Sequence, residues 1–263
     1  MIFLWLFIVS IVTIVTVVIL LVRYLKEEER HYEEKNSMLK KQMTSNIAHE
    51  LRTPVTSIRG YLETLIACPD LPQEKKQAFL ERAYTQTLRL SELISDMALI
   101  SKMEEKSSNF AKSQVDMFDV ANEVFFEFED KIKAKGAVVV NEIFPGTTLM
   151  GNRTLLYTIL RNMVENSLKY AGEGITLHLQ SFSPDGKNLD LTYYDTGSGV
   201  PEEHLERIFE RFYRISDGRT RDDGGSGLGL SIVRNAVAFH DGTIKASNRP
   251  EGGLQFTFSL RRK

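Results

Sequence analysis

The first 22 residues, MIFLWLFIVSIVTIVTVVILLV, carry no charge, and no other feature constrains the fold of this chain as strongly. As a helix the run would be about 33 Å long at roughly 1.5 Å per residue, close to the thickness of a bilayer core. The alternative is a secretory signal peptide, but no basic residue precedes the run and no small-residue cleavage site follows it. The sequence therefore predicts a transmembrane helix over residues 1–23.

The residues after the apolar run predict its orientation. Arg23, Lys26 and Arg30 are the first basic residues, and positive charge favours the cytoplasmic side of a membrane. We therefore expect a single-pass protein of the cell inner (cytoplasmic) membrane whose residues after the span lie in the cytoplasm. If the sequence is the whole protein, we expect no extracellular ligand-binding domain.

Composition excludes several classes of protein. The 33 basic and 35 acidic residues leave a net charge of -2, so we expect no nucleic-acid partner. The single cysteine, Cys68, can form neither an internal disulfide nor a cysteine-rich zinc site. The 241 residues after the apolar run suffice for one or two folded domains.

Two long helices are expected next. Residues 24 to about 67 lack proline before Pro54 and glycine before Gly60. Leu25, Tyr32 and Leu39 are seven residues apart, which predicts a coiled-coil stalk over residues 24–40; a solvated charged helix is the alternative.

Pro69 and Pro72 then break the helical pattern, and a second helix is expected from about Gln73 to Met103. Two such helices joined by a short loop make an antiparallel hairpin, which buries only one face of each helix. We therefore expect residues 41–106 to form a four-helix bundle in a homodimer.

Strands and helices are mixed after the polar stretch 104–114, which predicts a two-layer α/β sandwich over residues 112–263. The expected fold class is thus α+β multidomain. The expected elements are a strand near Val115, helices at 118–135, 153–170 and 229–240, and strands at 137–143, 175–182, 189–194, 243–247 and 254–260.

The first helix carries His49 followed by Glu50. A nucleophilic histidine needs a neutral ring nitrogen, and an adjacent carboxylate can hold the proton of the other nitrogen. Taken alone, the pair is more typical of a solvated helix face.

Two asparagines share a face of the helix predicted at 153–170. Asn162 and Asn166 are four residues apart, and an amide oxygen is a suitable ligand for Mg²⁺. Lys169, three residues further, can meet a phosphate. The alternative is a hydrated polar face.

Two glycine-rich segments complete the pattern. Asp195-Thr196-Gly197-Ser198-Gly199 follows an apolar strand, where a carboxylate can accept a hydrogen bond from an exocyclic amine; a plain turn is the alternative. Residues 224–230, GGSGLGL, lead into a helix whose first amides can bind phosphates. The pattern is neither a Walker motif nor a Rossmann fingerprint.

These segments, in this order, resemble those of a membrane-bound sensor histidine kinase of two-component signalling, over about residues 38–263. The matching boxes are the phosphoacceptor box at 45–54, the N box at 162–170, the G1 box at 195–199, the F box at 208–214 and the G2 box at 225–230.

The resemblance implies the cofactors ATP and Mg²⁺, an ATP-binding domain of the Bergerat type and a response regulator receiver domain as partner. It implies that His49 accepts the γ-phosphoryl group, that Glu50 activates His49 and that Thr53 positions water for dephosphorylating the regulator. Asn166 is the implied metal ligand. A lid is implied over residues 215–224, and the implied ATP-binding residues are Asn162, Asn166, Lys169, Tyr170, Asp195, Gly197, Gly199, Arg214, Gly225, Gly227, Leu228 and Gly229.

The sequence departs from the family pattern in two places. Ser167 stands where the family usually has alanine. Only 26 residues separate Arg23 from His49, too few for the HAMP relay that the family often places there, so the membrane helix would couple directly to the bundle. Residues 56–65 look most like the phosphate-regulon type of sensor kinase.

Two other functions are compatible with parts of this pattern. An ATPase of the same fold that does not phosphorylate itself would need neither His49 nor Glu50. A membrane-anchored dimeric scaffold, or a phosphatase-only pseudokinase, should lack Asn166, Asp195 or the glycines, and all of these are present.

Overall fold

The computed structural model describes residues 2–105, 110–183, 186–215 and 225–262; in its first helix it describes side chains at 5, 20–30, 38 and from 43 onward. The chain divides into two compact units, Met1–Thr56 and Ser57–Lys263. The elements are α1 (Ile2–Ala67), α2 (Gln73–Glu104), β1 (Ser113–Asp116), α3 (Met117–Glu127), α4 (Glu129–Ala134), β2 (Val138–Asn141), β3 (Thr148–Gly151), α5 (Arg153–Tyr170), β4 (Thr176–Phe182), β5 (Asn188–Asp195), two short 3₁₀ helices (Glu202–His204 and Arg207–Phe209), α6 (Gly229–Phe239), β6 (Ile244–Asn248) and β7 (Leu254–Arg261).

Helix α1 is continuous from Ile2 to Ala67 and confirms the long helix predicted after Tyr24. Most of the transmembrane segment predicted over 1–23 lies outside the residues whose side chains are described. Among the described residues, no helix combines the length and apolar character needed to cross a bilayer. Tyr32 and Leu39 of the predicted stalk also lie outside the described side chains.

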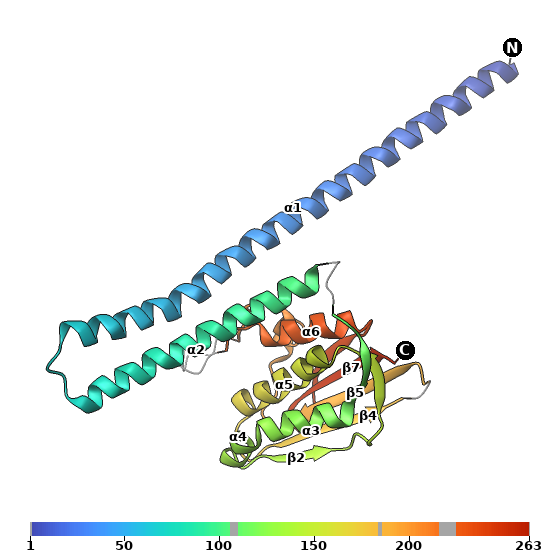
Figure 1. Cartoon of the computed structure of the whole chain (residues 1–263). Helices are drawn as coiled ribbons and strands as arrows, with labels where there is room; N and C mark the ends of the chain where they lie inside the picture. The colour runs from blue at the N-terminus through green and yellow to red at the C-terminus, as the bar shows by residue number, and fades with distance from the viewer. Residues whose placement is uncertain (1, 106–109, 184–185, 216–224, 263) are drawn as a thin grey trace. The chain divides into compact units, whose positions relative to one another are not determined.

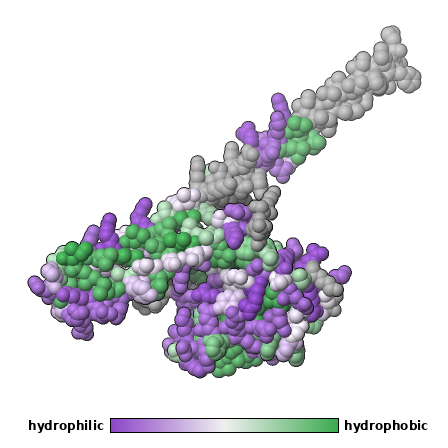
Figure 2. All heavy atoms as spheres, viewed as in Figure 1, coloured by the Kyte–Doolittle hydropathy of each residue, from purple (hydrophilic) through white to green (hydrophobic). Residues whose placement is uncertain are grey.

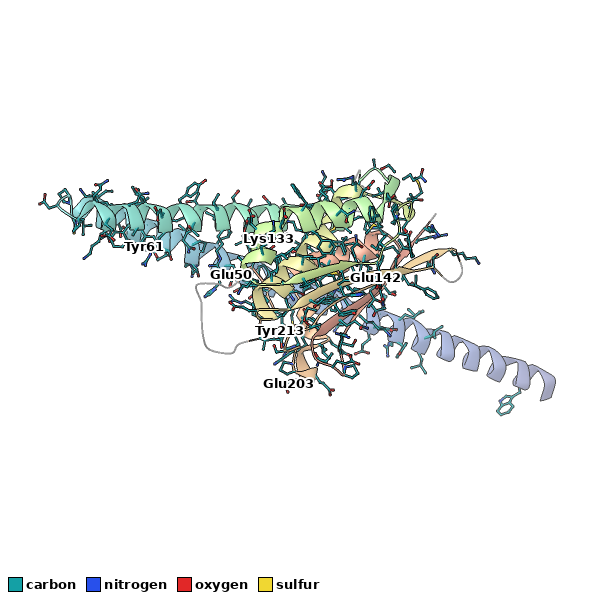
Figure 3. The ribbon with its side chains drawn as sticks, turned by 90° about the horizontal axis from the view of Figure 1, so that it is seen from below. Glu50, Tyr61, Lys133, Glu142, Glu203 and Tyr213 are labelled. Atoms are coloured by element: carbon teal, nitrogen blue, oxygen red, sulfur yellow. The ribbon has the colours of Figure 1, made fainter. Side chains whose placement is uncertain are left out.

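Helix α2 begins and ends within one residue of the prediction. A turn at Cys68–Leu71 reverses the chain, and the Tyr61 ring of α1 stacks on the Phe79 ring of α2 with centroids 5.8 Å apart (Tyr61 is labelled in Figure 3). The two helices therefore form the predicted antiparallel hairpin (Figure 1).

The remaining elements form the predicted two-layer sandwich. Five strands make one sheet in the order β2-β4-β5-β7-β6, in which only β2 and β4 are parallel. Helices α3, α5 and α6 cover one face of the sheet (Figure 1). Strands β1 and β3 pair separately as an antiparallel ribbon.

The alternation along β5 places a charged residue in the core. Every second residue of β5 is buried, and the last of this series is Asp195. Helix α5 presents a buried stripe at three- and four-residue spacing toward the same sheet, and Ser167 belongs to that stripe. The strand period and the helix period thus bring a carboxylate and a hydroxyl into the interior.

The structure corrects two sequence predictions. The helix expected over 118–135 is two helices, because Phe128 leaves the helical conformation at φ -93° and ψ 5° while its ring is buried. Strand β3 was not predicted; it has four residues and pairs with β1, more than 30 residues earlier in the chain. So short an element carries no periodic signal.

His240 joins the end of α6 to the start of α5. Its Nδ1 lies 2.7 Å from the Ala236 carbonyl oxygen, and its Nε2 accepts a hydrogen bond of 3.0 Å from the Asn152 backbone N–H. The ring is therefore neutral with its proton on Nδ1. Burial lowers the pKa of His240 below its ordinary value, against the opposing hydrogen bond to Ala236.

We expect the free energy of unfolding to fall as the pH drops below about 6.5, the ordinary histidine pKa, because the unfolded chain then takes up a proton that folded His240 refuses. The expected loss is about 1 kcal/mol between pH 7 and pH 5. Urea unfolding of the full chain across this range measures it. His240→Gln should be less stable at pH 7 and should show a flatter pH dependence; an unchanged slope would contradict the prediction.

Candidate functional site

Asp195 ends β5 with a buried carboxylate that is held from three sides. Its Oδ1 accepts hydrogen bonds from the backbone N–H groups of Gly197 (3.0 Å) and Leu254 (3.1 Å), and its Oδ2 accepts one of 2.7 Å from the Ser167 hydroxyl. A buried carboxylate held this firmly is a fixed acceptor, and Oδ2 keeps a lone pair for a further donor.

The glycines after Asp195 are required by packing. A Cβ at Gly197 would lie 2.4 Å from the Ala171 carbonyl oxygen, at the end of α5. Gly199 has a φ of +73°, and a Cβ there would lie 2.6 Å from the Asn248 side-chain oxygen. The loop therefore lies directly against α5 and β6.

The two predicted asparagines on the polar face of α5 differ in whether their side-chain amides are hydrogen-bonded. Asn162 donates a hydrogen bond of 2.9 Å to the Thr158 carbonyl, and a Cβ at Gly229 would lie 2.5 Å from the Asn162 side-chain oxygen. Asn166 is half-buried, and within the described part of the chain its side chain makes no hydrogen bond. Of the two amides, Asn166 is the one left open for a ligand.

The end of α5 lies beside the glycine-rich loop. A Cβ at Gly225 would lie 3.4 Å from Lys169 Nζ and 3.7 Å from the Tyr170 hydroxyl. The Gly225 N–H points toward that hydroxyl at 3.5 Å. An ammonium group, a phenol and backbone amides thus converge, which is the chemistry that recognises phosphates.

Phe212 and Gly227 are joined across the predicted lid. The Phe212 N–H donates a hydrogen bond of 2.8 Å to the Gly227 carbonyl, and both residues have positive φ, 63° and 70°. A Cβ at Gly227 would lie 2.9 Å from the Phe212 backbone. Leu228 is buried and Arg214 is exposed. The lid predicted over 215–224 lies outside the described residues apart from Ile215.

His49 lies in the other compact unit, on α1. Its ring is 75% exposed, and its Nδ1 lies 3.7 Å from the nearer carboxylate oxygen of Glu50. Thr53 donates a hydrogen bond of 3.2 Å from its hydroxyl to the His49 carbonyl. The ring therefore turns Nδ1 toward an acceptor and leaves Nε2 available.

Several of the site residues named from the sequence lie around α5, and the structure adds contacts that the sequence did not predict. Ser167 contacts Asp195 directly, and Gly253 passes so close that a Cβ there would lie 1.8 Å from the Asp195 carbonyl oxygen. The only signal for Gly253 was the glycine pair 252–253 between two strands, which is typical of a turn. Phe212 lies in the F box at 208–214, but the sequence did not predict its hydrogen bond to Gly227.

Both parts of the chain match known families. Residues 39–106 match the His Kinase A (phospho-acceptor) domain, and residues 151–263 match the family described as histidine kinase-, DNA gyrase B-, and HSP90-like ATPase.

Two curated relatives are similar to this chain over most of its length. Sensor histidine kinase YcbM of Bacillus subtilis is 30% identical over 224 residues, covering 84% of this chain and 71% of YcbM. Signal transduction histidine-protein kinase BaeS of Escherichia coli is 32% identical over 227 residues, covering 86% of this chain and 48% of BaeS. The chain thus spans about half of BaeS and more of YcbM.

Solved structures are similar over most of the chain. Histidine kinase AdeS of Acinetobacter baumannii has a TM-score of 0.68 at 25% identity, covering 82% of this chain and 98% of the AdeS chain. Histidine kinase ThkA, solved in complex with the response regulator protein TrrA, has a TM-score of 0.69 at 27% identity, covering 91% of this chain and 66% of that chain.

Proposed function

The chain belongs to the sensor histidine kinases of two-component signalling, and we propose that it transfers the γ-phosphoryl group of ATP to His49 and then to an aspartate of a response regulator. The observation that carries the proposal is the buried, triply hydrogen-bonded carboxylate of Asp195 beside an open amide and an ammonium group. That combination fits a purine at one end and a polyphosphate at the other.

Asp195 is the proposed reader of the base. The oxygen Oδ2 faces the interior between β5 and α5 and has one lone pair beyond the bond from Ser167. The exocyclic amine of adenine is a donor of the right kind for it. Gly197 and Gly199 keep the loop beside this carboxylate free of side chains.

Asn166 is the proposed metal ligand. In nucleotide sites Mg²⁺ takes few protein ligands and several phosphate oxygens, so one open amide oxygen fits its needs. Among the described residues no cluster of three or more acidic, histidine or cysteine side chains offers another site. Bound Mg²⁺ would neutralise charge on the phosphates, while Lys169, Tyr170 and the amides at Gly225, Gly227 and Gly229 would hold them.

His49 is the proposed nucleophile. Its Nε2 lone pair forms the bond to the γ-phosphorus while the bond from that phosphorus to the bridging oxygen breaks, and ADP leaves with the electron pair. The ring gains positive character, and the Nδ1 proton faces the Glu50 carboxylate at 3.7 Å, which stabilises that charge. Thr53 is proposed to position water when the regulator is dephosphorylated.

The surface of α2 supports a homodimer. Leu80, Tyr84 and Leu88 follow one another at four-residue spacing, and each is at least 48% exposed. Figure 2 shows apolar residues gathered along the helical hairpin. A second hairpin would cover this stripe and complete a four-helix bundle.

The N-terminal residues are proposed to anchor the protein in the inner membrane as a single span. Support comes from the uncharged run 1–22 and the basic residues that follow it. The sequence also carries Asn166 and Asp195, which a scaffold or pseudokinase should lack.

Incubating the full chain with γ-labelled ATP and Mg²⁺ tests the proposal: we expect a label that acid removes and base does not. Asp195→Asn should lose it and raise the Kd for ATP at least about 100-fold, because an amide nitrogen would face one of the donors that the carboxylate accepts. Asp190→Asn, the same change in the same strand but outside its buried series, is the control and should retain the label. A wild-type chain that binds ATP without becoming labelled would support the scaffold instead.

A further inference from the structure

Ser167 occupies a place that its helix does not require to be polar. It is 1% exposed and lies in the apolar stripe with which α5 covers the sheet. A serine inside a helix commonly bonds to the carbonyl four residues earlier. Here the hydroxyl instead reaches β5 and donates a 2.7 Å hydrogen bond to Asp195 Oδ2, 28 residues later in the chain.

This hydrogen bond completes the restraint on the carboxylate. The two backbone donors, from Gly197 and Leu254, both go to Oδ1, so without Ser167 nothing among the described residues holds Oδ2. A terminal carboxyl torsion is broad, and two bonds to one oxygen leave the other free to swing. The Ser167 hydroxyl fixes the plane of the group and the direction of the remaining lone pair.

The direction of the Ser167 hydroxyl proton also decides whether a bound base faces hydrogen-bond donors or acceptors. A hydroxyl has one donor, and Ser167 has directed its proton to Asp195, so only its lone pairs are left. Oδ2 and Ser167 Oγ together therefore present acceptors alone. A 6-amino purine supplies donors to such a pair, whereas the 6-oxo group of hypoxanthine is an acceptor and is repelled.

We propose that Ser167 is a positioning residue for base selection, which orients Asp195 so that the site distinguishes 6-amino from 6-oxo purine nucleotides. The inference rests on the proposed function, in which Asp195 reads the base. It adds a residue, and a specificity, at the position where this sequence departs from the alanine usual in the family.

Tyr193 provides a matched control. Its hydroxyl is buried two residues before Asp195, close to the Ser167 hydroxyl, and makes no hydrogen bond to the Asp195 carboxylate. Burial raises the pKa of this phenol, and the hydroxyl lies close enough to Ser167 and Asp195 for both to influence it. Tyr193→Phe therefore deletes a buried hydroxyl from the same neighbourhood without removing a bond to the carboxylate.

The test is the affinity of the full chain for Mg²⁺-ADP and for Mg²⁺-IDP, the inosine nucleotide, by calorimetric titration. Wild type should prefer ADP. Ser167→Ala should weaken ADP binding about 10-fold and leave IDP binding within about 2-fold, so the preference shrinks by about an order of magnitude. Ser167→Cys, a weaker donor of similar size, should give an intermediate preference, and Tyr193→Phe should keep that of wild type.

The outcomes distinguish a failure of the proposed function from a failure of the role proposed for Ser167. If wild type binds neither nucleotide, the proposed function is wrong. If wild type prefers ADP and Ser167→Ala keeps the full preference, or weakens both nucleotides equally, the role of Ser167 in base selection is overturned while the nucleotide site stands. Melting temperatures of the variants identify a loss that comes from folding alone.

Discussion

Replacing His49 by Gln is expected to abolish the acid-labile label completely while leaving the Kd for ATP within about 2-fold of wild type. Glutamine has no ring nitrogen that can form a phosphoramidate, so the loss is chemical and no other residue compensates for it. His49 and the residues proposed to bind ATP lie in different compact units, so ATP affinity should not follow the label. Labelling and calorimetry on the same preparation measure both.

The chain supplies a matched control for this experiment. His178 also lies beside a glutamate, with its Nε2 3.6 Å from Glu142 Oε1, which is close to the 3.7 Å between His49 and Glu50. It belongs to β4, in the sheet rather than on the first helix. His178→Gln should label normally. Acid-labile label that survives His49→Gln and disappears in His178→Gln would reassign the phosphoacceptor.

Replacing Gly253 by Ala should cost about 4 kcal/mol or more of unfolding free energy and abolish ATP binding. The φ of Gly253 is +101°, and the new Cβ would lie 1.8 Å from the Asp195 carbonyl oxygen and 2.7 Å from its carbonyl carbon. Both contacts are with backbone, which cannot rotate away. The strand that carries the Asp195 carboxylate must therefore shift, and denaturant unfolding with ATP titration measures the result.

Gly252→Ala separates the cost of a positive φ from the cost of the clash with Asp195. Gly252 has a similar φ of +95°, but the nearest atom to its Cβ would be the Gly197 oxygen at 3.4 Å, an ordinary contact. It should lose only about 1 kcal/mol, the cost of a left-handed residue without a clash. Equal losses in the two variants would show that backbone conformation, and not proximity to Asp195, governs this turn.

The sequence alone predicted the helices and strands in which apolar residues recur at a regular spacing. Helix α5 has the predicted bounds because its stripe is regular and the Asn152 side chain caps its first turn, accepting a 3.1 Å hydrogen bond from Leu155 N–H. Strands β5 and β7 alternate clearly. The break at Phe128 was missed because burial of one ring, a tertiary effect, outweighs helical propensity there.

The candidate site was predicted in its residues but not in its contacts. The polar types and glycines on α5 and in the two loops suggested nucleotide chemistry before any geometry was known. The contact between Ser167 and Asp195 depends on how α5 is rotated over β5, and that is set by packing of the whole stripe. A single sequence shows which residues of α5 are buried, but it does not show which of them lies opposite Asp195.

The bond between Phe212 and Gly227 bears on how proteins of this kind diversify. It joins the two residues that flank a 14-residue segment. Doubling the length of such a segment costs only about 0.6 kcal/mol in closure entropy. A change in the length of this stretch therefore costs little closure entropy, while the buried Asp195 carboxylate keeps its own hydrogen bonds to the sheet and its loop.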